Sequence, residues 1–201
     1  MKRLYMIGGP MGVGKTAACR QLQQLLDRSV FLDGDWCWDA HPFQVTEETR
    51  EMVLENISFL LNSFLRCSAY DHVIFCWVLH RREIWEDLLR RLTEPYVLRA
   101  VSLVCTPETL RSRLEGDIRA GKRIPDVLDR SLAYLPLYDA LDIRHLDVTA
   151  LTPRETAERT RLNIKKKLSG SMDISNRVQK FVDCRTKDVS CLLYTSDAAD
   201  D

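Results

Sequence analysis

The residues between Gly9 and Thr16, GPMGVGKT, are the first in the chain whose types and spacing suggest chemistry. They match the pattern G-x-x-x-x-G-K-[ST] at every fixed position. Glycines let the backbone turn tightly and aim N–H groups at phosphate oxygens. The lysine can reach the β- and γ-phosphates, and the threonine hydroxyl can bind Mg²⁺. We therefore expect ATP and Mg²⁺ to bind here. The expected nucleotide contacts are Gly9, Gly12, Val13, Gly14, Lys15, Thr16, Ala17 and, further along the chain, Arg113.

Two acids, Asp33 and Asp35, follow the second apolar run and are the best candidates for the acidic part of this site. Proteins with such a phosphate loop usually hold Mg²⁺ with an acid at the end of a neighbouring strand, and the third apolar run, HVIFCWVLH, contains none. One acid could hold Mg²⁺ through water while the other accepts the proton of an acceptor hydroxyl. We predict Thr16 and Asp33 as metal ligands and Lys15, Asp33 and Asp35 as catalytic, with the division between the two acids left open. Alternatively, Asp-Gly-Asp simply forms a turn.

Residues 119–125 form a polar stretch that contains Gly121 and several cations. In kinases with a mobile lid, arginines in such a stretch close over the phosphates and stabilise the transferring charge. We therefore predict Arg119 and Arg123 as catalytic residues. The alternative is a solvated helical face in which these arginines pair with acids such as Asp117.

Three further basic residues, His80, Arg81 and Arg82, end the third apolar run and begin a helical pattern. Cations at a helix N-terminus oppose its dipole by roughly 0.3–1 kcal/mol each. That arrangement suits an anionic ligand. It is equally compatible with arginines that point to solvent or pair with Glu83 or Glu86.

Apolar runs that alternate with helical patterns predict the elements that position these residues. Strands are expected at 3–8, 29–32, 72–79, 97–105 and 143–148, and helices at 15–27, 47–67, 83–92, from 106 onward, at 126–138 and at 152–168. Such alternation predicts an α/β fold, with a parallel sheet covered by helices on both faces. Ligands then bind at the carboxyl ends of the strands.

Together these motifs resemble shikimate kinase and its relatives, which include chloramphenicol phosphotransferase-like proteins and kinases labelled AAA family ATPase. The resemblance rests on the P-loop, the Asp-x-Asp, the basic lid-like segment and Pro136-Leu137-Tyr138, and it covers residues 3–168. It implies a P-loop NTPase three-layer sandwich with a five-stranded parallel sheet in the order 2-3-1-4-5, an acceptor region after the second strand, and a mobile lid. Shikimate kinases carry glycines where this chain has Val78-Leu79-His80, so the resemblance does not extend to shikimate as the acceptor.

The composition excludes several classes of partner. Lys plus Arg and Asp plus Glu number 29 each, and zero net charge gives no general attraction to nucleic acid or membranes. No apolar stretch approaches the roughly 20 residues that span a bilayer. The seven cysteines form no CxxC pair, which indicates reduced thiols in a cytoplasmic protein.

The chain divides into a kinase-like domain at 1–168 and a poorly structured tail at 169–201. The tail is polar and aperiodic, and its closing CLLYTSDAADD resembles translated sequencing-adapter read-through. We therefore expect no function there.

The expected activity is transfer of the γ-phosphate of ATP to a small hydroxyl- or phosphate-bearing acceptor, by a monomer or a homodimer. The alternatives are a nucleotide-binding regulator without an acceptor and an ATPase. A guanine-specificity motif of the NKxD type is absent, which argues against a GTPase.

Overall fold

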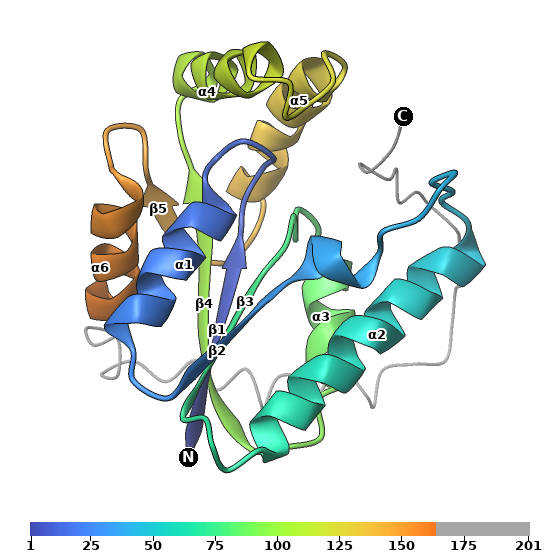
Figure 1. Cartoon of the computed structure of the whole chain (residues 1–201), viewed down its shortest axis with the longest axis vertical. Helices are drawn as coiled ribbons and strands as arrows, with labels where there is room; N and C mark the ends of the chain where they lie inside the picture. The colour runs from blue at the N-terminus through green and yellow to red at the C-terminus, as the bar shows by residue number, and fades with distance from the viewer. Residues whose placement is uncertain (164–201) are drawn as a thin grey trace.

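Five parallel strands form the centre of the protein in the order β2-β3-β1-β4-β5 (Figure 1). The computed structural model describes residues 1–163. The strands are β1 (Lys2–Gly8), β2 (Ser29–Asp33), β3 (His72–Cys76), β4 (Tyr96–Val104) and β5 (His145–Asp147). This arrangement confirms the predicted α/β fold and the strand order implied by the resemblance.

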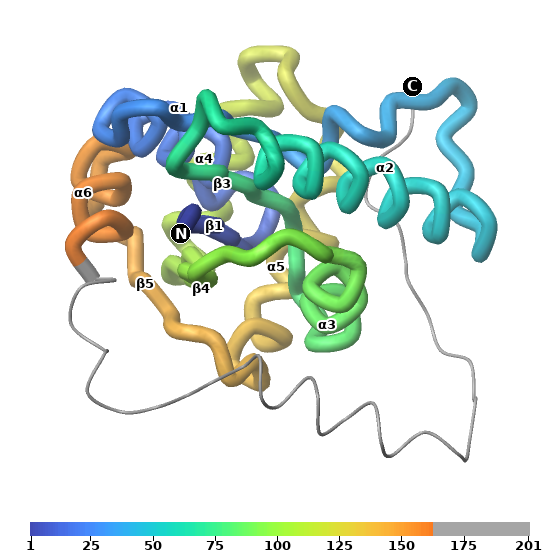
Figure 2. The backbone as a smooth tube through the Cα atoms, turned by 90° about the horizontal axis from the view of Figure 1, so that it is seen from below, coloured from blue at the N-terminus to red at the C-terminus, as the bar shows by residue number. Residues whose placement is uncertain are grey.

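Helices cover both faces of the sheet. They are α1 (Lys15–Leu25), α2 (Glu47–Arg66), α3 (Arg82–Arg90), α4 (Pro107–Arg119), α5 (Val127–Asp139) and α6 (Pro153–Asn163), and a short 3₁₀ helix, η1 (Gly34–Cys37), follows β2. Figure 2 shows α1 and α6 on one side of β1 and α3 on the other. The helices α4 and α5 lie beyond the carboxyl ends of the strands (Figure 1).

Alternating side chains of the strands feed two separate apolar cores, because successive residues of a strand point to opposite faces. Tyr5 and Ile7 of β1 pack with α1, α4 and α6 on one face. Leu4 and Met6 pack with α2 and α3 on the other. A strand buried on both faces reads as a continuous apolar run, which is why the sequence revealed the central strands clearly.

Two helices begin at threonines that cap them. The hydroxyls of Thr46 and Thr106 accept hydrogen bonds from the backbone N–H groups of Thr49 (3.2 Å) and Thr109 (3.3 Å). Such caps satisfy donors that have no partner within the helix. They fix where α2 and α4 start relative to the sheet.

The third strand is shorter than predicted and ends at Cys76 rather than Leu79. Its neighbour β2 ends at Asp33, which pairs with Cys76, so β3 loses its outer partner there. Leu79 then adopts a positive φ of 46°, which turns the chain towards α3. The apolar run in the sequence extends past the end of β3 because Leu79, although outside the strand, is fully buried.

The helix α5 continues through Pro136 to Asp139, one residue beyond the predicted helix at 126–138. A proline inside a helix removes one backbone hydrogen bond. A tertiary contact offsets this loss. The hydroxyl of Tyr138, the next-to-last residue of α5, donates a hydrogen bond to the carbonyl of Val78 at 2.7 Å.

The predicted tail at 169–201 and the last residues of the predicted final helix lie outside the described residues. Within residues 1–163, none of the helices combines the length and the apolar character that crossing a membrane requires. The cysteines of this part are free thiols, of which Cys19, Cys76 and Cys105 are buried.

Candidate functional site

The P-loop, Gly9–Thr16, connects β1 to α1 and depends on three glycines with positive φ. A Cβ on Gly9 would lie 2.7 Å from the carbonyl oxygen of Leu103, and one on Gly12 would lie 2.5 Å from Leu114. These two glycines let the loop pack closely on β4 and α4. Gly14, at φ 101°, caps α1 and has no neighbouring atom within 4 Å of a Cβ, so this helix N-terminus is open to an anion.

Lys15 curls back over the loop. Its ammonium donates hydrogen bonds to the carbonyls of Gly9 (2.9 Å) and Pro10 (3.0 Å). Burial lowers the pKa of Lys15, and the nearby carboxylates of Asp33 and Asp35 partly oppose that shift. A desolvated ammonium beside open backbone donors is a strong site for phosphate oxygens.

Thr16 and Asp33 meet across the site although 17 positions separate them. The Thr16 hydroxyl donates to the Asp33 carboxylate at 2.6 Å. Asp33 is the last residue of β2 and is buried, and its other carboxylate oxygen accepts from the backbone N–H of Asp35 at 3.2 Å. Asp33 therefore caps η1 and faces the P-loop at once.

The donor set fits Mg²⁺. A threonine hydroxyl and a carboxylate are hard oxygen donors, and Mg²⁺ is usually bound by one or two carboxylates together with substrate phosphates. No cluster of three or more His, Cys, Asp or Glu able to hold a metal occurs within residues 1–163. Thr16 and Asp33 supply two donors and would leave the remaining positions of the ion to phosphate oxygens and water.

Asp35 differs from Asp33 in its surroundings. It lies on η1 and is exposed, whereas Asp33 is buried. Desolvation raises the pKa of Asp35, and Asp33 adds to that effect, whereas Lys15 and a hydrogen bond from Trp77 oppose it. A carboxyl group with a raised pKa beside a phosphate site is suited to accept a proton.

Arg113 lies beside the P-loop and holds it in place. Its guanidinium donates to the carbonyls of Val13 (2.9 Å) and Val148 (2.8 Å), so α4 ties the loop to the end of β5. Ser131 of α5, which the sequence analysis missed, also donates to the carbonyl of Met11 at 2.6 Å. The hydroxyl of a helical serine gives no sequence signal for such a contact.

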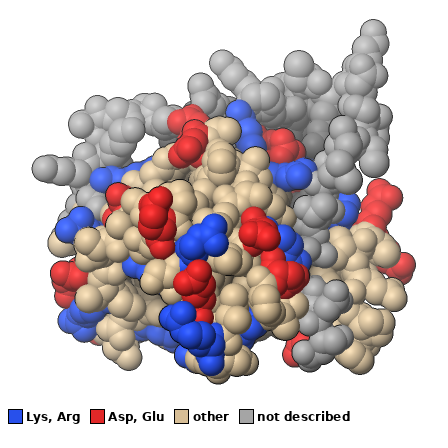
Figure 3. All heavy atoms as spheres, turned by 90° about the horizontal axis from the view of Figure 1, so that it is seen from above, with Lys and Arg blue, Asp and Glu red and all other residues tan. Residues whose placement is uncertain are grey.

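The lid arginines differ in position. Arg119, the last residue of α4, is exposed. Arg123 pairs with Asp117, with 3.3 Å between Nε and Oδ2. This is the ion pair expected if the arginines belong to a solvated helical face. Desolvation is the largest cause of the pKa shifts of Lys15 and Asp35. The charge of Arg123 makes a smaller contribution to both shifts. Arg123 is therefore near the site, and over this end of the molecule basic side chains alternate with acidic ones (Figure 3).

The basic residues after β3 divide between the surface and the interior. Arg82 pairs with Glu86 at 2.7 Å on the exposed face of α3. His80 is buried and stacks on Tyr134 of α5, with ring centroids 4.5 Å apart. Burial, aided by the charge of Arg81, lowers the pKa of His80 to about 4. This histidine is neutral at physiological pH.

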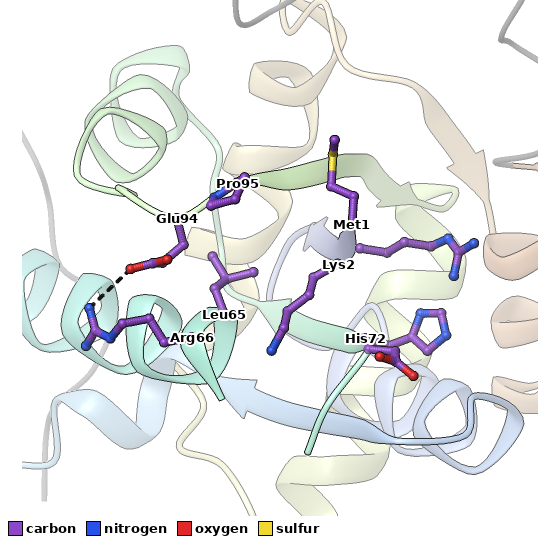
Figure 4. Close-up of a pocket in the computed structure, with 9 residues that line it drawn as sticks. Met1, Lys2, Leu65, Arg66, His72, Glu94 and Pro95 are labelled. Atoms are coloured by element: carbon purple, nitrogen blue, oxygen red, sulfur yellow. Dashed lines mark ion pairs between the residues drawn. The ribbon is translucent and has the colours of Figure 1, made fainter. Parts of the chain in front are cut away.

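A hollow of about 740 Å³ lies at the opposite, amino-terminal end of the sheet (Figure 4). Three of the charged side chains that line it have partners close by. Arg66 faces Glu94 at 3.6 Å, and the Lys2 ammonium donates to the carbonyls of Phe64 and Cys67 at the end of α2. The phosphate-binding groups are all at the other end of the sheet, so this hollow is not the candidate site.

Solved structures share the fold at low sequence identity. The tunicamycin resistance protein of Deinococcus radiodurans is 18% identical, with a TM-score of 0.59 over 82% of this chain and 96% of that one. A gluconokinase from Sinorhizobium meliloti 1021 is 17% identical, with a TM-score of 0.56 over 90% and 97%. The shikimate kinase of Acinetobacter baumannii in complex with shikimate is 21% identical, with a TM-score of 0.53 over 84% and 96%. No sequence among the curated proteins matches the chain.

The sequence also matches a family directly. Residues 6–131 match the AAA domain, which is more than half of the 201-residue chain. The matched region contains the P-loop, both acids after β2 and the lid arginines. With this match and a fold shared with P-loop kinases, the chain belongs to the AAA domain family.

Proposed function

We propose that this protein is an ATP-dependent phosphotransferase that moves the γ-phosphate of ATP to a small acceptor bearing a hydroxyl or phosphate group. The observation that carries the proposal is the 2.6 Å hydrogen bond between Thr16 and Asp33. It brings a P-loop hydroxyl and a buried carboxylate to one point at the carboxyl ends of the strands, where ligands of parallel sheets bind.

The P-loop binds the phosphates of ATP. The backbone N–H groups around Gly12 and Gly14 and the N-terminus of α1 face the phosphate oxygens. Lys15 leaves the carbonyls of Gly9 and Pro10 and donates to the β- and γ-phosphates. Thr16 and Asp33 are the residues that would hold Mg²⁺. The ion would neutralise charge on the phosphate oxygens when bound.

Asp35 is the general base. It accepts the proton of the acceptor hydroxyl while the new bond between the acceptor oxygen and phosphorus forms and the bond from phosphorus to the leaving oxygen of ADP breaks. Its exposure leaves it open to an acceptor, and its raised pKa gives it basicity that an ordinary aspartate lacks.

The arginines stabilise the charge of the transferring group. Arg123 and Arg119 lie on or beside the segment between α4 and α5, and they approach the phosphates when this segment closes. Arg113 contacts the nucleotide from the middle of α4 while it holds the P-loop. The names of the structural relatives, a gluconokinase and a shikimate kinase among them, support small hydroxyl-bearing acceptors.

Label transfer from [γ-³²P]ATP tests the proposal. The protein is incubated with Mg-ATP, with and without a metabolite extract filtered to small molecules, and the products are separated. We expect extract-dependent label in an organic phosphate, and none with the Lys15→Ala variant. Release of label only as inorganic phosphate, at the same rate with and without extract, would instead favour an ATPase.

A further inference from the structure

Two arginines flank Tyr5 near the amino-terminal end of the sheet, on the face that α1 and α6 cover. Tyr5 of β1 pairs in register with Arg99 of β4, and Arg3 precedes Tyr5 by two positions on β1. Residues two apart on a strand point to the same face of the sheet, as do partners in a parallel register. Both arginine side chains therefore leave the sheet beside the tyrosine.

A third arginine reaches this place from α6. Nη1 of Arg161 donates a hydrogen bond to the carbonyl of Leu25, the last residue of α1, at 3.2 Å. Figure 2 looks onto this end of the sheet and shows α1 and α6 along one side of β1. Burial raises the pKa of Tyr5, and the charges of Arg3, Arg99 and Arg161 all oppose that rise. Three cations thus act on one phenol.

His72 of β3 completes the group. It pairs in register with Arg3, and its ring centroid lies 5.8 Å from that of Tyr5. Arg3 and His72 also line the hollow at this end of the sheet, where Figure 4 shows the imidazole, so a solute in the hollow can reach the group. The five residues that we call the Tyr5 cluster are Arg3, Tyr5, His72, Arg99 and Arg161.

The polar groups of the Tyr5 cluster lack partners within residues 1–163. Tyr5 is only 4% exposed, yet its hydroxyl makes no hydrogen bond in this range. The side chains of Arg3 and Arg99 form no ion pair there, and Nε of Arg99 and Nδ1 of His72 are buried without a hydrogen-bond partner. Because buried polar groups are nearly always hydrogen-bonded, these donors are arranged for a ligand.

The nearby acids do not neutralise the cluster. Two carboxylates act on His72, those of Asp71 and Asp27. Asp71 already pairs with Arg28 at 2.9 Å, and Asp27 is exposed in the turn after α1. The arginines of the cluster therefore keep their charge available for an anion.

We propose that the Tyr5 cluster is a second anion-binding site, which takes the phosphate group of a small molecule. Guanidinium groups donate paired hydrogen bonds to phosphate oxygens, and the phenol supplies one more donor. A doubly charged phosphate offsets the mutual repulsion of three cations better than a singly charged carboxylate does. The site lies at the end of the sheet opposite the P-loop and is independent of the proposed phosphotransferase activity.

A titration followed residue by residue tests the site. The full-length ¹⁵N-labelled protein is titrated at pH 7.5 with sodium phosphate, and separately with sodium chloride and sodium acetate at matched ionic strength. We expect the backbone amide signals of Arg3, Tyr5 and Arg99 to shift saturably with phosphate alone. Signals of the P-loop report the nucleotide site separately in the same spectra. Equal shifts with chloride would overturn the site, and equal affinity for acetate would overturn its assignment to phosphate.

A parallel titration with glycerol 3-phosphate separates a phosphate ester from the free ion. The ester should shift the same three amide signals, since the cluster contacts only its phosphate group. An ester that does not bind would restrict the site to inorganic phosphate and overturn the assignment to a small molecule.

Variants test which side chains hold the anion. Arg99→Gln should weaken phosphate binding at this end roughly 10- to 100-fold, because it removes a charge-assisted contact. Tyr5→Phe keeps the ring in the core and should weaken binding roughly 2- to 10-fold. Arg28→Gln is the matched control, since Arg28 pairs with Asp71 at the same end, and its affinity should equal that of wild type. Wild-type affinity in Arg99→Gln would overturn the proposal. If that variant does not fold, wild-type affinity in Tyr5→Phe would do so.

Discussion

The hydroxyl of Thr16 donates a 2.6 Å hydrogen bond to the carboxylate of Asp33, joining the first turn of α1 to the end of β2. This length is typical of a charge-assisted O–H···O⁻ bond. It joins Asp33 directly to Thr16, the proposed metal ligand of the P-loop, while Asp35 is exposed on η1. The two acids of the Asp-Gly-Asp turn therefore have different tasks in the proposed function.

Asparagine at these two positions should separate those tasks. We expect Asp33→Asn to weaken ATP binding chiefly in the presence of Mg²⁺, because it removes a charged oxygen from the metal site. Asp35→Asn should spare ATP binding and lower turnover by roughly 10²–10⁴-fold. Calorimetric titration of ATP with and without Mg²⁺, together with turnover, measures both effects, with exposed Asp39→Asn as control. Full turnover in both variants would reduce the pair to a turn.

Lys15→Ala should abolish the stabilisation of the fold by Mg-ATP, because it removes the ammonium that would be desolvated against the phosphates. At about 100 times the Kd, ligand binding stabilises a folded protein by about 2.7 kcal/mol, which thermal unfolding detects easily. Lys2→Ala, at the opposite end of the sheet, should retain the ligand-induced shift. An equal shift in folded Lys15→Ala would contradict the P-loop assignment.

Arg123→Ala should lower kcat by roughly 10²–10³-fold and weaken ATP binding far less, because a closing arginine acts mainly on the transition state. Arg119→Ala tests the second lid residue in the same way. Arg90→Ala is the matched control, since Arg90 pairs with Asp87 on α3. Hydrogen exchange of residues 120–126 should slow when ATP and acceptor bind. Equal exchange with and without ligands argues against a lid.

The buried His80 should make folding stability depend on pH. Its pKa falls from 6.5 to about 4 in the folded protein, so below pH 6.5 the unfolded chain binds a proton that the folded protein refuses. Stability should therefore fall as pH drops from 6.5 to about 4, by up to roughly 3 kcal/mol from this group. Urea unfolding at pH 7.5 and 5 measures the loss. It should shrink in His80→Phe and persist in the control His41→Gln; an unchanged pH dependence in His80→Phe would show that other groups cause it.

The P-loop and the fold class of this protein could be predicted from its sequence, because local chemistry dictates the residue types at those positions. The P-loop can be recognised in the sequence because three of its positions have a positive φ and two of them approach β4 and α4 closely, and glycine stands at each. The central strands are visible because a strand covered on both faces must be apolar throughout. These apolar runs alternate with helical patterns. A parallel sheet covered by helices is the arrangement that buries all of the runs, so the pattern alone predicted the fold class.

Tertiary structure decided which distant residues meet. The sequence indicated that Asp33 lies at the end of a strand, but only the placement of β3 between β2 and β1 packs Trp77 against Gly34, between the two acids. Likewise, Arg113 reaches Val13 across 100 positions, and Ser131 reaches Met11 across 120. These contacts depend on the order of strands and the docking of α4 and α5 over their carboxyl ends. Such arrangements result from the burial of whole helix faces, and no local pattern around an arginine, a serine or a tryptophan encodes which backbone group it will meet.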